Sequence, residues 1–170
     1  EIAKRLKEQG ILAGVVADWE AAAAHSPVST ALLRTGNVLA RHGGYLAAQW
    51  PAFALGLGGR VGSGRQFVSW ISLADHVRAT AFLLDSELTG PVNLVAPEPV
   101  SNAEFTRVFG SHVHRPTPLP LPLGAVGLVF GREFVKELLL PGQRVRPAHL
   151  LDAGFEFEHK TVRQAFAALS

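Results

Sequence analysis

The stretch GSGRQFVSWISLAD, residues 62–75, runs from a glycine-rich loop into an apolar strand and then into the start of a helix. Gly62 and Gly64 permit positive φ angles, so the loop can turn tightly and present polar side chains. The β-branched and aromatic residues of 67–71 predict a strand. Ser72, with an acid three residues later, is typical of a helix N-terminus, and apolar residues follow at helical spacing. This order of elements predicts an α/β fold.

The loop also carries polar side chains that suit an anionic ligand. Arg65 offers a planar fork to phosphate or carboxylate, and Ser63 and Gln66 add neutral donors. We expect Trp70 near the carboxyl end of its strand, where open α/β sheets bind ligands, with its ring partly walling the pocket. These four residues are the predicted substrate-binding set. The alternative is that the loop is only a stable corner of the domain.

Composition limits the classes of function. A chain of 170 residues, 48% hydrophobic and 18% charged, can bury a sizeable core in one domain or in one domain with a small satellite. Sixteen basic against 14 acidic residues give a net charge of only +2, which argues against a nucleic-acid partner. The absence of cysteine excludes disulfides and thiolate metal sites and favours a cytoplasmic location. The seven histidines show no metal-ligand spacing, so no metal site is predicted.

No apolar run reaches the roughly 18 residues that a membrane span requires, so no membrane partner is predicted. The first ten residues lack the apolar core of a signal peptide, and the sequence contains no methionine. We therefore expect this sequence to be a fragment, a processed chain or one incompletely represented.

Periodicity and capping signals place the other elements. The Pro-rich segment 115–123 is interpreted as an ordered connector, with a polyproline recognition ligand as the alternative. Strands and helices alternate without internal repeats, which indicates the α/β class. Helices are expected over 1–9, 11–24, 45–53, 72–84, 101–113, 148–153 and 161–169, a helical hairpin over 124–140, and further strands over 28–33 and 92–95.

Four motifs, taken in order, resemble one family: LRTGNVLA at 33–40, GSGRQFVSWISLADHVRA at 62–79, GPVNLVAPEPVSNAEF at 90–105 and LLPGQRVRPAHLLDAGFEF at 139–157. They are similar to the C-terminal half of the extended short-chain dehydrogenase/reductase superfamily, the nucleotide-sugar epimerases. More narrowly, the chain looks like the SulA-type epimerase family proteins with their C-terminal domain of unknown function.

The resemblance implies a Rossmann-like, NAD(P)-binding fold. Residues 1–95 would form its last strands and helices, and residues 96–170 a mostly helical substrate-side lobe. NAD or NADP would be the cofactor, and a small molecule or nucleotide sugar the ligand. The glycine pattern that binds pyrophosphate after a first strand is missing from the first 60 residues. The chain therefore looks like the second half of such a protein.

The same resemblance implies site residues. Superfamily chemistry uses a Tyr with a Lys four residues later, but the matching positions fall near Leu12 and Val16, and Tyr45 is followed by Gln49. The catalytic residues thus stay unknown. The turn after the strand that ends in Arg34 would approach the nicotinamide, which makes Arg34, Thr35, Gly36 and Asn37 the predicted cofactor-side residues.

Several alternatives stay open. Arg34 could instead form a structural salt bridge at the end of its strand. The chain could be a binding or regulatory protein that keeps the fold and has lost the chemistry. It could also be a structural lobe that is stable only in a homo-oligomer.

Overall fold

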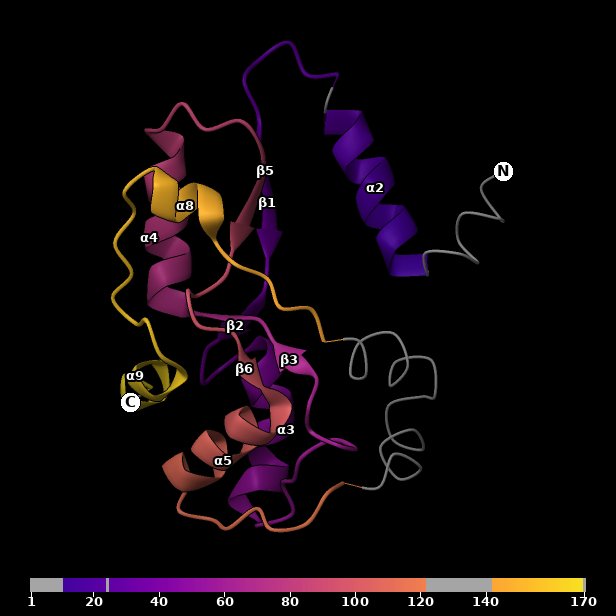
Figure 1. Cartoon of the computed structure of the whole chain (residues 1–170), viewed down its shortest axis with the longest axis vertical. Helices are drawn as coiled ribbons and strands as arrows, with labels where there is room; N and C mark the ends of the chain where they lie inside the picture. Colours follow the sequence, from indigo (N-terminus) through magenta and orange to yellow (C-terminus); the bar gives the residue numbers. More distant parts are fainter. Residues whose placement is uncertain (1–10, 24, 122–141, 170) are drawn as a thin grey trace.

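The computed structural model describes residues 11–23, 25–121 and 142–169 (Figure 1). The helices expected over 1–9 and 124–140 lie outside these residues. The described elements form two layers, one stacked above the other along the long axis of the molecule. Within the described ranges, no helix combines the length and the apolar character needed to cross a bilayer.

A parallel pair of strands forms the centre of the upper layer. Strand β1 (Ala31–Thr35) pairs with β5 (Gly90–Leu94) in a register that joins Ala31 to Gly90 and Thr35 to Leu94. In Figure 1, helices α4 (Leu73–Leu84) and α8 (Ala148–Asp152) lie to the left of this pair, and α2 (Ile11–Ala23) lies to the right. An apolar cluster fills the space between the strands, α4 and α8: Ile71, Ala79, Leu83, Val92, Leu94, Leu150, Phe155 and Phe157.

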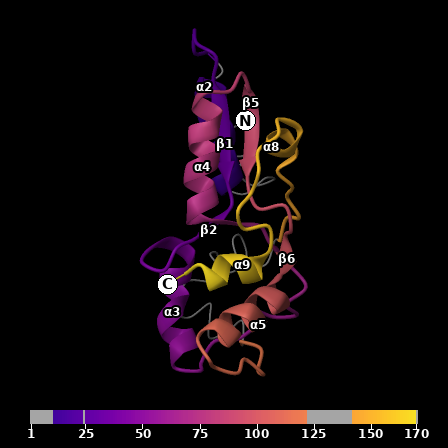
Figure 2. The ribbon, with the colours of Figure 1, turned by 90° about the vertical axis from the view of Figure 1, so that its left-hand side faces the viewer.

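Two short strand pairs and three helices form the lower layer. Strand β2 (Asn37–Leu39) runs parallel to β4 (Trp70–Ser72), and β3 (Phe67–Val68) pairs antiparallel with β6 (Val100–Ser101). They pack with α3 (Gly44–Ala54), α5 (Asn102–His112) and α9 (Val162–Ala167), and Figure 2 shows α9 crossing between the end of α4 and α5. Aromatic rings fill this core, with the rings of Phe53 and Phe109 stacked 4.0 Å apart.

The three predicted helix caps are confirmed. The side chains of Ser72, Ser101 and Thr161 each accept the backbone N–H three residues later, at the starts of α4, α5 and α9. The Gln164 side chain also reaches back to the Thr161 N–H and completes a capping box. Such caps satisfy N–H groups that have no partner within the helix, so they fix where these helices begin.

Two strand predictions need correction. The strand expected over 28–33 is found at Ala31–Thr35, because its pairing with β5 starts at Gly90 and Val28 is an exposed loop residue. The single strand expected over 67–71 is split at Ser69 into β3 and β4, which pair with different partners. The Ser69 carbonyl accepts both the backbone N–H and the side-chain amide of Asn37, at 2.9 and 3.1 Å. Those bonds hold Ser69 between the two ladders.

Candidate functional site

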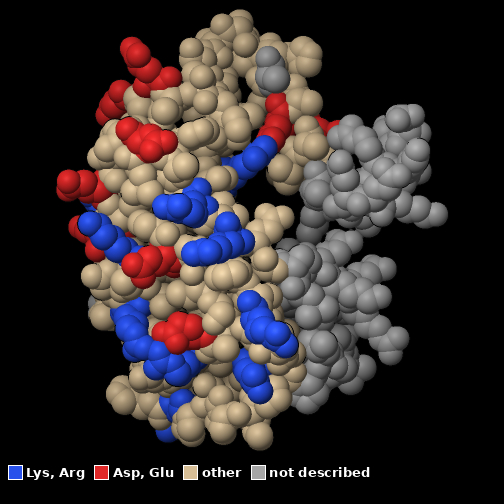
Figure 3. All heavy atoms as spheres, in the orientation of Figure 1, with Lys and Arg blue, Asp and Glu red and all other residues tan. Residues whose placement is uncertain are grey.

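A cavity of about 1080 Å³ runs between α2 and the strand pair, along β1 from Thr30 to its carboxyl end and on to Asn37. The face drawn in Figure 3 is hollowed beside α2, and a basic and an acidic side chain meet at the edge of this hollow. All four predicted cofactor-side residues, Arg34, Thr35, Gly36 and Asn37, line the cavity. The carboxyl ends of parallel strands form the usual ligand crevice of open α/β sheets.

The charged pair at this cavity is Arg34 and Glu20. Arg34 Nε donates to Glu20 Oε1, and Arg34 Nη2 donates to Oε2, both at 2.7 Å. The hydrogen bond from Arg34 lowers the pKa of the Glu20 carboxyl, and the same bond raises the pKa of Arg34. Both groups are therefore ionised at neutral pH, and the salt bridge foreseen as the alternative role of Arg34 is present.

The next three residues are held by backbone and side-chain bonds. Thr35 Oγ1 lies 3.3 Å from His76 Nε2 on α4, and the Gly36 N–H donates to the Leu94 carbonyl at 3.1 Å. A Cβ on Gly36 would come within 2.8 Å of the Val95 side chain and 2.9 Å of the Ser69 carbonyl oxygen. Glycine is therefore needed here for close approach of two chain segments.

The cavity is also lined by residues that are not in the predicted site: Glu20 and Ser69, which sequence reasoning missed, and Asn93, for which a bond to the backbone was expected. Glu20 projects from α2, Asn93 lies on β5 between the buried Val92 and Leu94, and Ser69 marks the split between β3 and β4. The amide of Asn93 donates to the Arg146 carbonyl at 3.2 Å. A signal for Asn93 existed, because alternation along a strand puts it on the face opposite its two apolar neighbours. Glu20 and Ser69 depend on contacts distant in sequence.

The predicted substrate loop is placed elsewhere. Ser63, Arg65 and Gln66 line neither of the two cavities described here, and Arg65 is exposed. The backbone of the loop is joined to the start of α5: the Ala103 N–H donates to the Gly64 carbonyl at 2.9 Å, and the Asn102 N–H donates to the Gln66 carbonyl at 2.8 Å. The backbone of the loop therefore has a structural role, which is to hold the start of α5. This role does not prevent its polar side chains from binding a ligand.

Its two glycines have the predicted positive φ angles. The values are 56° at Gly62 and 69° at Gly64, in the left-handed region that favours glycine. The reading of the loop as a tight turn is thus correct.

The expectation for Trp70 is wrong. The Trp70 side chain has no exposed surface, and it belongs to the lower core. Its indole Nε1 donates to the Glu98 carbonyl at 3.0 Å, and the residue lines neither described cavity. The ring turns inward because the face of β4 that carries it is covered by the aromatic core and not by the cavity.

Tyr45 is partly buried and packs against the lower core. Its ring lies 5.6 Å from that of Phe105, and burial raises the pKa of its phenol. The Gln49 side chain donates to the Tyr45 backbone carbonyl. This tyrosine, which is the only one in the sequence, lines neither cavity.

Asp75 has the architectural role expected of an acid at a helix start, and it also binds the backbone of a segment more than 80 residues later. Its fully buried carboxylate accepts four hydrogen bonds, from Ser72 Oγ, Arg78 Nη1 and the backbone N–H groups of Glu158 and His159. The ligand atoms of Asp75, Glu158 and His159 lie within 4.8 Å of one another. Because both carboxylate oxygens of Asp75 already accept two donors each, this cluster does not favour a cation.

Comparison with known proteins gives one match to a family model and several long alignments. Residues 121–169 match the model described as "Domain of unknown function (DUF1731)". The chain is 52% identical over 160 residues to epimerase family protein Mb2239 of Mycobacterium bovis, an alignment that covers 92% of this chain and 53% of that protein. It is 39% identical over 146 residues to human epimerase family protein SDR39U1, covering 84% of this chain and 50% of that one. The chain thus spans about half the length of these relatives.

Solved structures give a consistent result. Human epimerase family protein SDR39U1 (isoform 2), solved with NADPH, superposes with a TM-score of 0.83 at 37% identity, over 91% of this chain and 53% of that one. A nucleoside-diphosphate sugar epimerase from Corynebacterium glutamicum gives 0.68 at 30% identity, over 92% and 30%. The UDP-glucose 4-epimerase of Thermus thermophilus, at 0.58 and 15% identity over 93% and 53%, shows the shared fold alone. The fold is the Rossmann-like α/β fold of these proteins.

Proposed function

We propose that this chain, which is similar to epimerase family proteins at up to 52% identity, belongs to the extended short-chain dehydrogenase/reductase type. In an NAD(P)-dependent epimerase-like protein it would contribute the nicotinamide and substrate side. The observation that carries the proposal is the cavity between α2 and the strand pair, which at the carboxyl end of β1 is lined by Arg34 to Asn37. A human relative with 37% identity was solved with NADPH, which supports this choice of cofactor.

The strand pair suits extension into a larger sheet. Among the described strands, β1 pairs only with β5, so its other edge has no strand partner there. Two consecutive residues of β1, Leu33 and Arg34, are exposed. Helix α2 exposes Val16 and Trp19, the latter with 72% of its surface accessible. We propose that residues 1–95 belong to a Rossmann-like domain that further chain completes on this edge, and that residues 96–170 form the substrate-side lobe. The greater length of the relatives supports this division.

The substrate is proposed to be a nucleotide sugar or a similar small molecule. The name of the relative from C. glutamicum, a nucleoside-diphosphate sugar epimerase, supports that class. Arg65, with Ser63 and Gln66 beside it, would contact the anionic part of the ligand, and its exposed side chain supports this proposal. We further propose the SulA type for this chain, a cytoplasmic location and a possible homo-oligomer. The match of residues 121–169 and the lack of cysteine support the first two points.

A second candidate is a protein that binds the dinucleotide without hydride chemistry. It is favoured by the packing of Tyr45 against the lower core, which keeps the sole tyrosine of this sequence away from the cavity. Glu20 is the acidic side chain that lines the cavity, and its pairing with Arg34 keeps it deprotonated. As a carboxylate it could accept a proton, but it cannot donate one near neutral pH.

Nicotinamide binding can be tested by saturation-transfer NMR. NADPH and reduced nicotinamide mononucleotide would each be added to the chain, and transfer to nicotinamide and adenine protons compared. Arg34→Met is the test variant. Arg107→Met is its matched control, because Arg107 is a similarly exposed arginine paired through two nitrogens with Glu104, outside the cavity.

The proposal predicts transfer to the nicotinamide protons from both compounds, loss of this transfer in Arg34→Met, and no loss in Arg107→Met. Transfer confined to adenine protons, or equal spectra for both variants, would contradict it. Retained transfer with no turnover of nucleotide sugars would favour the binding role over the catalytic one.

A further inference from the structure

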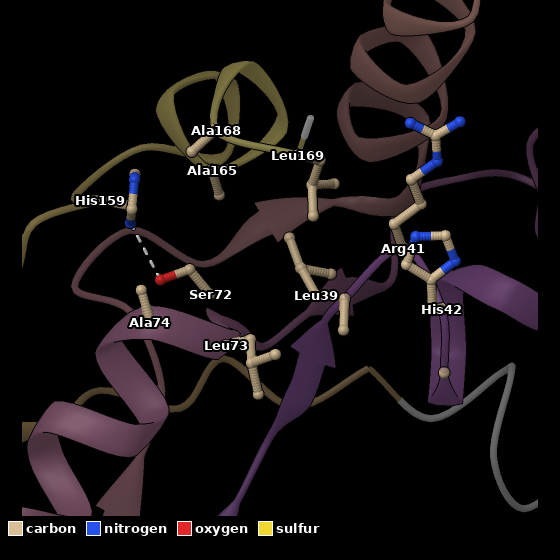
Figure 4. A pocket seen from close by; sticks show the side chains of 12 residues that line it. Leu39, Arg41, His42, Ser72, Leu73, Ala74, His159, Ala165, Ala168 and Leu169 are labelled. Atoms are coloured by element: carbon tan, nitrogen blue, oxygen red, sulfur yellow. Dashed lines mark hydrogen bonds between the residues drawn. The ribbon is translucent and has the colours of Figure 1, made fainter.

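A second cavity, of about 470 Å³, lies away from the proposed nicotinamide site and shares no lining residue with it. Its walls come from the ends of the parallel strands β2 and β4, the first residues of α4, and the inner face of α9 (Figure 4). Segments near residues 40, 73 and 165 therefore build one cavity. It opens at the carboxyl ends of paired parallel strands, where α/β folds place ligands.

The floor of this cavity is apolar. In Figure 4 the side chains of Leu39, Leu73 and Leu169 point toward a common space, and Ala165 of α9 and Ala168, the residue after that helix, approach it. Leu39 is only 1% exposed. Leu73, the first residue of α4, is apolar and yet 48% exposed. An apolar side chain left half-exposed at a helix start can be covered by an apolar ligand that enters the cavity.

One end of the cavity carries positive charge. Arg41 and His42 lie together there (Figure 4), and Arg41 makes no ion pair with any described residue. The Arg41 guanidinium lies 5.5 Å from the ring centroid of Trp50. Gly43, the N-cap of α3, also lines this end and provides no side-chain cap, so the partial positive charge of that helix terminus adds to it.

The polar groups at the other end already have partners. Ser72 Oγ lies 3.0 Å from His159 Nδ1, and it also donates to Asp75 and accepts its N–H. Asp75 itself does not line the cavity, and no acidic side chain does so among the described residues. A ligand here therefore meets an apolar floor, a cationic end and, among the described residues, no opposing acidic side chain.

We propose that this cavity binds a small apolar carboxylate, a medium-chain acyl or aromatic acid, with its carboxylate at Arg41 and its apolar part over Leu39, Leu73 and Leu169. The volume suits a ligand of about ten heavy atoms or more. Neither a sugar nor a nucleotide fits this chemistry, because the floor offers almost no hydrogen-bond partners. The site is thus independent of the proposed cofactor cavity.

The test is calorimetric titration of the chain with octanoate, octanol and acetate, followed in parallel by tryptophan emission. Octanol keeps the apolar part without the charge, and acetate keeps the charge without the apolar part. Trp19→Phe removes an exposed indole and leaves two others, Trp50, which lies beside Arg41, and the fully buried Trp70. A change of emission that depends on Arg41 is therefore assigned to Trp50. Arg41→Gln is the charge variant, and Lys160→Gln is its control, because Lys160 is exposed beside His159 but does not line the cavity.

Octanoate should bind more tightly than octanol or acetate and change the Trp50 emission. Arg41→Gln should weaken octanoate about two- to fivefold, as expected for a partly solvated ion pair, and Lys160→Gln should leave it unchanged. Leu73→Asp should weaken octanoate further, since it puts a like charge on the floor while an acid at a helix start keeps α4 stable. Equal affinity for octanol and octanoate, or equal effects of the Arg41 and Lys160 variants, would overturn the proposal.

Discussion

The carboxylate of Asp75 accepts the backbone N–H of His159 at 2.9 Å, across 84 positions of the sequence. The same carboxylate accepts the Glu158 N–H at 2.8 Å, so one buried side chain fixes the segment that leads into α9 to the start of α4. Both layers of the molecule meet at this residue, because α4 covers the upper strand pair and α9 packs in the lower core.

Replacing Asp75 should cost much of the stability. Asp75→Ala leaves the N–H groups of Glu158 and His159 and the Arg78 guanidinium without their acceptor. We expect it to lower the free energy of unfolding by about 3–5 kcal/mol, because two backbone N–H groups and the Arg78 guanidinium lose a fully buried anionic acceptor. Urea denaturation measures the change, with the exposed Asp85→Ala, expected within about 0.5 kcal/mol of the parent chain, as control. Equal midpoints for both variants would contradict the role given to Asp75.

The same carboxylate should make stability depend on acid. Burial by itself raises the pKa of Asp75, but the N–H groups of Glu158 and His159, the Ser72 hydroxyl and the nearby imidazole outweigh it, so its pKa lies below the usual range. The stabilisation is then fully present above the unfolded-state pKa of about 3.9 and is lost as pH falls through the lower folded-state value.

Urea midpoints measured downward from pH 6 check this dependence, with Asp75→Asn as the variant that lacks the titrating group. The parent chain should lose stability relative to Asp75→Asn below about pH 4. A constant difference between the two chains down to acid pH would show that Asp75 titrates alike in the folded and unfolded states.

Trp70 should behave as a core residue and not as a ligand contact. Trp70→Phe removes the hydrogen bond to the Glu98 carbonyl and leaves unfilled volume, so a loss of about 1–3 kcal/mol is expected. In a chain with Trp19 and Trp50 replaced by Phe, Trp70 emission should be blue-shifted and insensitive to iodide and to NADPH. Emission that responds to NADPH would restore Trp70 to the site.

Arg65 tests the substrate-side hypothesis. Its side chain is exposed, so Arg65→Ala should leave the melting temperature nearly unchanged. If it contacts the anionic part of a nucleotide sugar, the variant should bind UDP-glucose about 1.5 kcal/mol more weakly, the lower end of the range for a hydrogen bond to a charged group. Calorimetry measures this, with Arg107→Ala as control. A loss of stability without a change in affinity would make Arg65 a structural residue.

Dinucleotide affinity provides a further test. Because the 170-residue sequence lacks the glycine pattern that places pyrophosphate on a helix N-terminus, NADPH should bind to it only in the range of about 1 mM or weaker. Isothermal titration measures this directly. Micromolar binding would mean that the cavity at β1 and β5 holds the phosphates as well as the nicotinamide.

The helix starts were predictable from the sequence because their signals are local. Ser72, Ser101 and Thr161 each cap with the N–H three residues on, a pattern contained within one helical turn. The split at Ser69 was not predictable, because it depends on Asn37 and on the backbone near Gln143 and Val145, all distant in sequence. A run of β-branched and aromatic residues does not reveal that its two halves pair with different strands.

The part of the candidate site that could be predicted from the sequence is the run of consecutive residues at the end of one strand. Arg34 and Thr35 end β1, Gly36 and Asn37 come directly after it, and all four line the cavity together. That they face a cofactor stays a prediction from the family resemblance. Glu20 could not be placed there from its helix alone, since the bond to Arg34 requires α2 to lie beside β1. Trp70 was misassigned because strand alternation tells which side chains share a face, but not whether that face meets a cavity or a core.

The pairing of Ala31 with Gly90 also sets a delay during synthesis. About 60 residues must follow β1 out of the ribosome before β5 exists, which takes roughly 3–12 s at typical elongation rates. During that interval β1 has no β5 to pair with, and an apolar strand with free N–H and C=O groups can join the wrong chain. Arg34 places a charge on that strand, which disfavours such pairing. Its partner Glu20 is synthesised before it, so their hydrogen bond can form before β5 has been made.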